Sequence, residues 1–442
     1  MRRIRMGIDI GSSKTTIIVG ELYDQGKNIR ILGKAIIPSN GIKKGKIIDV
    51  ELFSRTLKLG KERLEDKIGI KLKKATVGMS GSDIKTSTTE VEYKLLDENV
   101  EEPIEVTEAH CNQIFEISKQ KVVKDDEQIL GKEVYNYRLD DSGIMKTPVG
   151  KVGKKLEARV HLIKIPKDRV DRVIEALNKA GIEVESLLYN GEASAKAALK
   201  RLDKINGVAL VDIGDGLTEI TIFKNNRLIS TNVIPIGGMH YINDLKYVLE
   251  LNGEVVKNIL LEMKDKKDNE KVTVSFLDKG TSVTKTFEVK YLREIIDART
   301  DEILEYILKS IEASGYKDYL KNGIVLAGGV VSGYNILDKL REIFGENIRI
   351  GTAINISGMT TQLKEPSAVS GMGVLLTALE DEYNDLLNGS NVEEKKEVNT
   401  TKVKEEKVEE KKEVKVEEKK KETNTSKPQT KSKLKKWLGN FI

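Results

Sequence analysis

An apolar strand that runs into a small, polar turn occurs twice in this chain, about 200 residues apart. The two copies are IDIGSSKT at residues 8–15 and VDIGDGLT at residues 211–218. Small residues let successive backbone N–H groups approach phosphate oxygens, and the hydroxyls of Ser12, Ser13 and Thr218 add donors. Either turn alone is more often an ordinary β-hairpin. The duplication favours a pair of phosphate-binding turns.

Each turn carries one aspartate, Asp9 in the first copy and Asp212 in the second. Such a carboxylate can hold Mg²⁺ through water or orient an attacking water, because Mg²⁺ prefers oxygen ligands and keeps much of its hydration shell. Two Gly-Gly turns follow, at residues 237–238 and 328–329. The second leaves room for a flat adenine against the backbone, although a helix-entry turn is the alternative. A P-loop is excluded, because residues 13–15 (SKT) lack the Gly-x4-Gly-Lys spacing.

The body of the chain, up to about residue 387, reads as α/β. Apolar runs such as residues 208–211 and 324–327 end in Gly turns, as buried strands do. Between such runs lie amphipathic segments, for example residues 170–177 with Gly181 as the stop. Over residues 388–433 large apolar residues are almost absent, which predicts a charged, disordered linker. Alternating Glu and Lys blocks between residues 393 and 422 leave a single solvated helix as the alternative.

The C-terminal segment, residues 434–442, is apolar again. Its apolar residues recur at i, i+3, i+4, i+7 and i+8, and lysines surround them. The apolar set is Leu434, Trp437, Leu438, Phe441 and Ile442, and the lysines are Lys433, Lys435 and Lys436. This pattern predicts an amphipathic helix in the interface of an anionic membrane, where Trp is favoured. Packing of the helix on the protein's own body or on a partner is the alternative.

Composition excludes several classes of protein. The 75 basic and 70 acidic residues nearly balance, and no basic stripe with interleaved aromatics occurs, so we expect no nucleic-acid partner. The basic start continues into a polar turn, and no run approaches 18 apolar residues, so we expect neither a signal peptide nor a transmembrane helix. A single cysteine, Cys111, suits a reducing compartment, and the histidines show no metal-ligand spacing.

The order and spacing of the glycine turns resemble the superfamily of actin, Hsp70 and the sugar kinases over most of residues 1–385. This resemblance implies two related halves that close on ATP and Mg²⁺. It implies that Asp9 and Asp212 face the metal, that Lys14 faces the phosphates and that Gly328 and Gly329 flank the adenosine. Catalytic roles are implied for Asp212 and for Glu192, which is also consistent with an ordinary surface position on a helix.

Several stretches resemble one branch in particular, the bacterial FtsA family of cell-division proteins. They are TPVGKVGKKLE (147–157), EASAKAA (192–198), IGGMHYINDL (236–245), EVVK (254–257), IIDARTDEI (295–303) and PSAVSGMG (366–373). The first resembles a segment of the family's extra subdomain, called 1C, and the following residues alternate as in a half-buried strand, at Leu156, Ala158, Val160 and Leu162. The fold class implied is therefore an actin-like ATPase with an inserted 1C subdomain.

The resemblance implies a set of nucleotide-binding residues and a division of the chain. The nucleotide-binding set is Asp9, Gly11, Ser12, Ser13, Lys14, Asp212, Gly214, Gly216, Thr218, Gly237, Gly238, Glu254, Lys257, Gly328 and Gly329. The division is 1A at 1–83, 166–195 and 365–387, 1C at 84–165, 2A at 196–237 and 301–364, 2B at 238–300, the linker at 388–433 and the helix at 434–442. One departure lies at the second turn, where Asp215, Leu217 and Glu219 replace the family's usual residues. A further carboxylate beside phosphates is repulsive by about 1 kcal/mol in water, which implies weaker ATP binding. The alternative is that Asp215 points to solvent or toward Mg²⁺.

The function implied is that of a peripheral protein that polymerises on the cytoplasmic side of the inner membrane at the division site and anchors the FtsZ ring there. Implied partners are the C-terminal peptide of FtsZ on subdomain 2B, further copies of the chain in a protofilament, an anionic membrane surface and later division proteins. Nucleotide hydrolysis is expected to be slow. A small-molecule kinase of the same superfamily and a pilus-assembly ATPase are the alternatives, and the predicted membrane helix argues against both.

Overall fold

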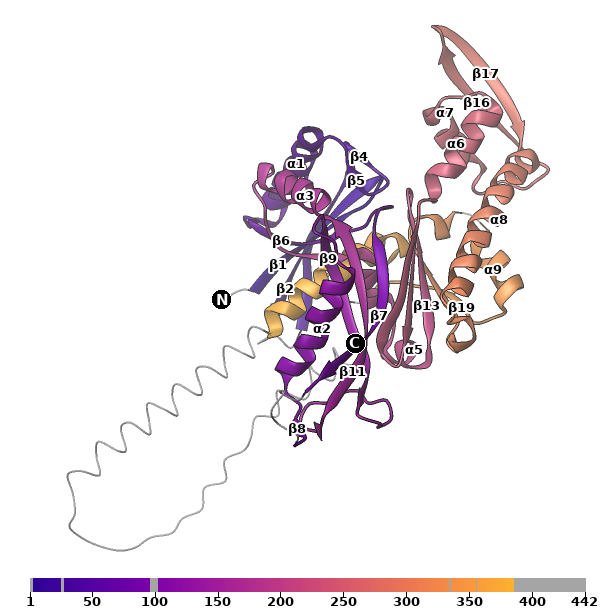
Figure 1. Cartoon of the computed structure of the whole chain (residues 1–442). Coiled ribbons are helices and arrows are strands. Elements are labelled where there is room, and N and C mark those ends of the chain that lie inside the picture. The colour runs from indigo at the N-terminus through magenta and orange to yellow at the C-terminus, as the bar shows by residue number, and fades with distance from the viewer. Residues whose placement is uncertain (1–2, 25–27, 96–101, 334, 355, 385–442) are drawn as a thin grey trace, which may run out of the picture.

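The computed structural model of the chain describes residues 3–24, 28–95, 102–333, 335–354 and 356–384 (Figure 1). Two five-stranded sheets form the centres of two halves. The predicted linker at 388–433 and the predicted membrane helix at 434–442, with its lysines, lie outside the described residues.

The sheet of the first half has the strand order β3-β2-β1-β6-β12. Its strands are β1 (Arg3–Ile10), β2 (Lys14–Tyr23), β3 (Asn28–Pro38), β6 (Lys74–Met79) and β12 (Glu183–Tyr189). Helices cover both faces, as the apolar strands require. On one face α1 (Val50–Ile68) packs on Gly33 and Ile37 of β3, and α3 (Lys167–Lys179) packs beside α1. On the other face a helix over residues 369–384 places Leu375 against Gly7 and Gly20.

The sheet of the second half repeats this topology with the order β15-β14-β13-β18-β19. Its strands are β13 (Val208–Ile213), β14 (Thr218–Lys224), β15 (Arg227–Ile234), β18 (Ile324–Ala327) and β19 (Ile348–Ile350). In both halves an antiparallel hairpin, β1–β2 or β13–β14, is followed by a parallel strand, β6 or β18. Asp9 pairs with Gly78 and Asp212 with Ala327, so the two aspartates occupy equivalent places. The two predicted turns therefore belong to two sheets of the same topology.

An inserted three-stranded antiparallel sheet lies between α1 and α3 in the chain. It has the order β7-β11-β9, formed by β7 (Lys85–Lys94), β9 (Glu127–Leu139) and β11 (Lys155–Pro166). Helix α2 (Glu108–Val122) covers one face, and the short strands β8 (Ile104–Glu105) and β10 (Val152–Gly153) pair at the far end. The alternating residues of β11, Leu156, Ala158, Val160 and Leu162, are buried in one core, as predicted.

Smaller elements complete the described part of the chain. A second layer of the second half is formed by α6 (Gly238–Leu249), α7 (Gly253–Met263), the hairpin β16 (Lys271–Asp278) and β17 (Thr281–Glu288), and α8 (Val289–Ala313) (Figure 1). The other helices and strands are β4 (Ile42–Lys43), β5 (Lys46–Ile47), α4 (Asn190–Ala198), α5 (Arg201–Asn206) and α9 (Ile336–Phe344). Short 3-10 turns lie at Lys317–Tyr319, Val330–Ser332, Thr361–Lys364 and Pro366–Ala368. Among the described helices, none has the length and apolar character that crossing a bilayer requires.

Candidate nucleotide-binding site

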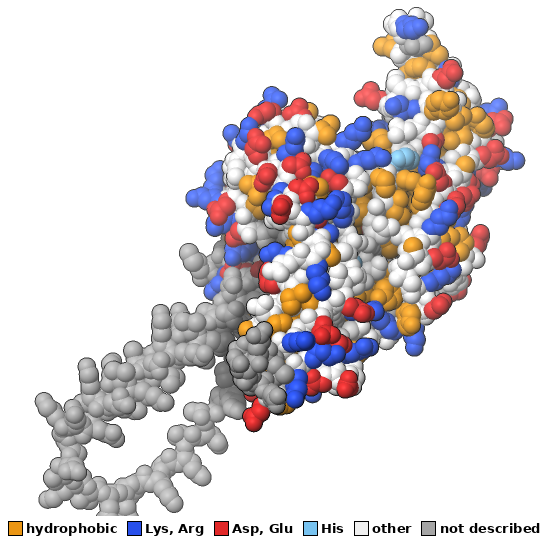
Figure 2. All heavy atoms as spheres, in the orientation of Figure 1, with side chains coloured by type: hydrophobic (Ala, Val, Ile, Leu, Met, Phe, Trp, Pro, Cys, Tyr) orange, Lys and Arg blue, Asp and Glu red, His pale blue; other side chains and the backbone are white. Residues whose placement is uncertain are grey.

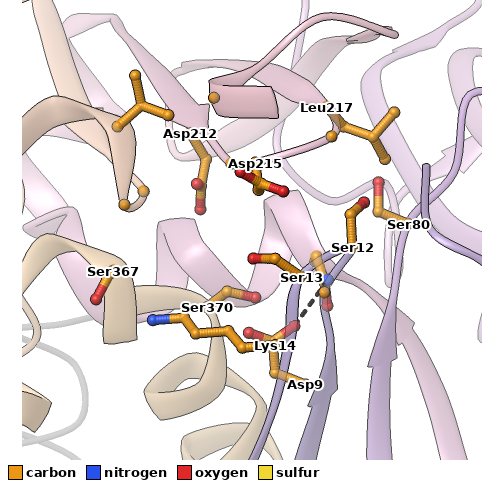
Figure 3. A pocket seen from close by; sticks show the side chains of 18 of the residues that line it. Asp9, Ser12, Ser13, Lys14, Ser80, Asp212, Asp215, Leu217, Ser367 and Ser370 are labelled. Carbon is orange, nitrogen blue, oxygen red and sulfur yellow. Dashed lines mark hydrogen bonds between the residues drawn. The ribbon is translucent and has the colours of Figure 1, made fainter. Parts of the chain in front are cut away.

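A cavity of about 470 Å³ lies between the two halves, where the turn after β1 faces the turn after β13 (Figure 3). This volume is in the range of small-molecule and cofactor sites. Its lining combines residues of both turns, of the Gly328-Gly329 turn and of the segment before the last helix. The lining residues include Asp9, Gly11, Ser12, Ser13, Lys14, Gly45, Ser80, Asn190, Asp212, Gly214, Asp215, Gly216, Glu219, Gly238, Gly328, Gly329 and Glu365.

The two turns have the same backbone geometry and touch each other. Gly11 N–H donates to the carbonyl oxygen of Lys14 at 3.1 Å, and Gly214 N–H donates to that of Leu217 at 2.9 Å. A Cβ atom on Gly216 would clash with the side chain of Ser12, so the closeness of the two tips requires glycine there. The backbone N–H groups of both turns are thereby brought to one end of a single cavity.

Helix α4 orients the aspartates of both halves. Asn190 Nδ2 donates to Asp9 Oδ1 at 2.9 Å, and Ser194 Oγ donates to Asp212 Oδ2 at 2.7 Å. These donors are four residues apart and therefore lie on one face of the helix. Burial, together with the charge of Asp212, raises the pKa of Asp9 to about 7, and burial also raises the pKa of Asp212. The protein groups around Asp9 and Asp212 therefore do not fully balance the negative charge of either carboxylate.

Two lining residues that were not among the predicted nucleotide-binding residues join the halves across the cavity. Ser80 follows β6 of the first half, and its hydroxyl donates to Oε1 of Glu219 on β14 of the second half at 2.8 Å. Burial and the neighbouring charge of Asp212 raise the pKa of Glu219 to about 8. Glu219 is the direct cross-strand partner of Asp212, a pairing that the hairpin around residues 214–217 could have indicated.

The charge of the lining suits a phosphate ligand only when a cation accompanies it. Five lining carboxyl groups, those of Asp9, Asp212, Asp215, Glu219 and Glu365, face one lysine, Lys14, among the described lining residues. Within the described part of the chain, no three acidic, His or Cys side chains are close enough together to hold a metal ion by themselves. A pair of carboxylates with room for water is what hydrated Mg²⁺ uses, so the donor set fits this ion, which Asp9 and Asp212 would hold.

The structure places most of the predicted site residues on the cavity wall and some elsewhere. Gly11, Ser12, Ser13, Lys14, Gly214, Gly216, Gly238, Gly328 and Gly329 line the cavity together with Asp9 and Asp212. Thr218, Gly237, Glu254, Lys257 and Glu192 are outside this lining. The Thr218 hydroxyl donates to the carbonyl oxygen of Ile236 at 2.8 Å, which joins β14 to the Pro235–Gly238 turn.

The charged residues outside the lining differ in how near they are to the cavity. Burial raises the pKa of Asp215, and Lys257 of α7 lies near enough for its charge to oppose this rise in part. Glu192 faces the inserted sheet beside Gly131. Burial and the charge of Glu133 raise the pKa of Glu192 to about 7. It is two residues from Asn190 on α4, on the side of the helix away from the aspartates.

The chain is similar in sequence to known cell-division proteins. A family model described as "Cell division protein FtsA" matches residues 209–373, and one described as "SHS2 domain inserted in FTSA" matches residues 81–164. The chain is 26% identical over 384 residues to the cell division protein FtsA of Pseudomonas aeruginosa, covering 86% of this chain and 90% of that protein. It is 28% identical over 375 residues to the FtsA of Bacillus subtilis, covering 84% and 82%.

A solved structure, the PilM-PilN type IV pilus biogenesis complex, is similar in fold. The TM-score is 0.57 with 12% sequence identity, over 85% of this chain and 98% of that chain. At this identity the likeness concerns the fold alone. Together with the duplicated sheets and the inserted domain, it confirms the predicted actin-like fold class for the described part of the chain.

Proposed function

Because the chain belongs to the FtsA family of actin-like cell-division proteins, we propose that it binds ATP with Mg²⁺ between its halves and anchors the FtsZ ring to the membrane. It does so as a polymer on the cytoplasmic side of the membrane at the division site. The observation that carries the nucleotide part is one helix, α4, that orients Asp9 and Asp212 toward one cavity from two equivalent turns.

In this proposal each part of the cavity has one task. The backbone N–H groups of the turns at 11–13 and 214–216 bind the phosphates, with Lys14 as the cation of the protein. Asp9 and Asp212 hold the hydration shell of Mg²⁺, and Asp212 orients the attacking water. Bound Mg²⁺ neutralises part of the phosphate charge. Hydrolysis is proposed to be slow. Glu192, the other proposed catalytic carboxylate, lies beside Gly131 of the inserted sheet and outside the cavity lining, which is consistent with this proposal.

The second layer of the second half is proposed to bind the C-terminal peptide of FtsZ. Exposed apolar side chains occur on several of its elements: Tyr247 of α6 is 87% exposed, and Leu261 of α7 and Leu277 of β16 are each 73% exposed. Figure 2 shows orange side chains gathered over this part of the molecule. Apolar anchors on exposed helices and strands are the usual means of holding a short peptide.

The membrane part of the proposal is supported by the sequence of residues 433–442 and by family membership. An amphipathic helix with five apolar side chains and adjacent lysines binds anionic bilayers weakly when alone. Polymerisation places several such helices on one surface, and their affinities then combine. In this proposal, stable membrane binding therefore requires self-association of the chain.

Calorimetry of the full chain with ATP, with and without Mg²⁺, tests the nucleotide site. We expect binding that requires Mg²⁺, and we expect Asp212→Ala to weaken it by at least about tenfold, or about 1.4 kcal/mol. Asp66→Ala removes an exposed carboxylate of α1 far from the cavity and is the matched control. Equal affinity of the Asp212→Ala protein and the wild type, with unchanged circular dichroism, would refute the assigned role.

A further inference from the structure

We propose that the turn between β4 and β5, residues 42–47 and here called the clasp, closes the mouth of the cavity and that Lys44 fastens it to the second half. This inference rests on the proposed nucleotide site and adds a residue that controls release of the nucleotide. Nothing in the sequence motifs pointed to the clasp, because its contacts are with residues far away in the chain.

The clasp is held firmly on the side of the first half. Gly45 N–H donates to Ser12 Oγ at 3.0 Å, which ties the clasp to the first phosphate turn. Arg169 of α3 donates to the carbonyl oxygen of Gly45 at 2.6 Å and pairs with Asp83, and Lys46 pairs with Asp83 at 2.9 Å. Ile42 and Ile47 are buried in the core of the first half. The clasp is therefore a fixed part of this half and not a loose loop.

The backbone of the clasp forms a tight hairpin turn. Lys44 has φ +47° and Gly45 has φ +72°, and Ile42 pairs with Ile47 and Lys43 with Lys46 on either side. Consecutive positive φ angles make a type I′ hairpin turn, in which Asn or Gly is preferred at the place of Lys44. A lysine in the left-handed region costs about 1 kcal/mol and persists where its surroundings demand it. The same pair of residue types, Lys279 and Gly280, makes the turn between β16 and β17, so it is the contacts of Lys44, and not its backbone angles, that distinguish the clasp.

Lys44 reaches across to the second half. Its Nζ donates to the carbonyl oxygen of Pro235 at 3.0 Å, in the turn that leads into α6. Its Cα atom lies 3.4 Å from the position that a Cβ of Gly216 would take, so it rests against the second phosphate turn. The clasp thus covers both phosphate turns from outside and contacts both halves.

Opening of the cavity at this end must break the Lys44–Pro235 contact. Separation of the halves removes the hydrogen bond and withdraws the clasp from Gly216. Entry of nucleotide occurs from the open form and does not require the contact. Loss of the Lys44 ammonium should therefore accelerate dissociation much more than association.

Stopped-flow dissociation of a fluorescent ATP analogue in Mg²⁺ from the full chain tests this role. Excess unlabelled ATP prevents rebinding. We expect threefold to tenfold faster dissociation from Lys44→Ala, with association changed less than twofold. Lys44→Arg should remain within twofold of the wild type, because a guanidinium can donate to the same carbonyl oxygen. Lys43→Ala, an exposed lysine of the same turn, is the control for charge and should also remain within twofold.

The outcomes separate the clasp from the nucleotide site itself. If the wild type binds the analogue and Lys44→Ala releases it at the wild-type rate, the clasp proposal is wrong and the nucleotide site stands. If Lys43→Ala accelerates release as much as Lys44→Ala, charge at the mouth and not the Pro235 contact controls release, and the proposal is also wrong. If the wild type binds no analogue in Mg²⁺, the proposed nucleotide site fails and the clasp with it.

Discussion

Glu219 shows how a single buried carboxyl group can make the two halves sensitive to pH. Its side chain is 8% exposed, accepts a hydrogen bond from Ser80 and pairs across the strands with Asp212. Burial raises its pKa from 4.5 to about 8, so it is protonated at neutral pH in the folded state and ionised in the unfolded state. Proton uptake on folding means that stability falls as pH rises between these two values.

Replacement of Glu219 by glutamine should reduce this pH dependence. For the nucleotide-free wild type, the free energy of unfolding should fall between pH 6 and pH 8, at most by about 1.4 kcal/mol per pH unit for one group. Glu219→Gln still accepts the hydrogen bond of Ser80 and cannot ionise, so its decline should be smaller. Part of the decline should remain, because Asp9 titrates near 7 as well. Urea unfolding at both pH values measures this, and equal declines would contradict the assignment.

At the level of elements, the inserted sheet is fixed to the second half by a buried polar joint. His161 of β11 bonds through Nδ1 to Thr88 Oγ1 at 2.8 Å and through Nε2 to Thr231 Oγ1 of β15 at 2.9 Å. Burial lowers the pKa of His161 to about 4, so the ring is neutral near pH 7, with one nitrogen donating and the other accepting. Arg227 of β15 and Glu133 of β9 add an ion pair at 2.8 Å.

Thr231→Val should weaken this joint. Valine has the shape of threonine without the hydroxyl, so the buried Nε2 of His161 loses its partner, at a cost of about 1–3 kcal/mol. Thr231→Ser keeps the hydroxyl and should cost less. The midpoints of urea unfolding compare the two variants with the wild type. Equal midpoints for all three proteins would show that the joint contributes nothing to stability.

What the sequence reveals about the elements depends on the distance between interacting residues. The two Asp turns and the alternation in β11 were predictable, because each pattern lies within one hairpin or one strand. Ser80 and Glu219 are 139 residues apart, and Lys44 and Pro235 are 191 apart, so only the fold brings them together. Asn190 and Ser194 are an intermediate case. Their helical spacing can be read from the sequence, but the carboxylates that accept their hydrogen bonds, Asp9 and Asp212, cannot.

For the whole molecule, three of the contacts between the described parts of the two halves come from different elements. They are the clasp at the mouth, the Ser80–Glu219 hydrogen bond inside the cavity and the His161–Thr231 joint of the inserted sheet. We therefore propose that a nucleotide bound between the halves influences the position of the inserted sheet and of the second layer of the second half together. In our proposal the two halves bind FtsZ, the predicted membrane helix binds lipid, and the predicted linker connects them.

Co-sedimentation of FtsZ with anionic liposomes tests that link most directly. FtsZ is mixed with the vesicles, Mg²⁺ and ATP, and with the full chain, with Trp437→Glu or with Asn440→Ser, which alters a polar position of the same segment. We predict that FtsZ sediments with vesicles in the presence of the wild type and of Asn440→Ser, and remains in solution with Trp437→Glu or without the chain. Equal sedimentation of FtsZ with Trp437→Glu and with the wild type would contradict the proposed anchor.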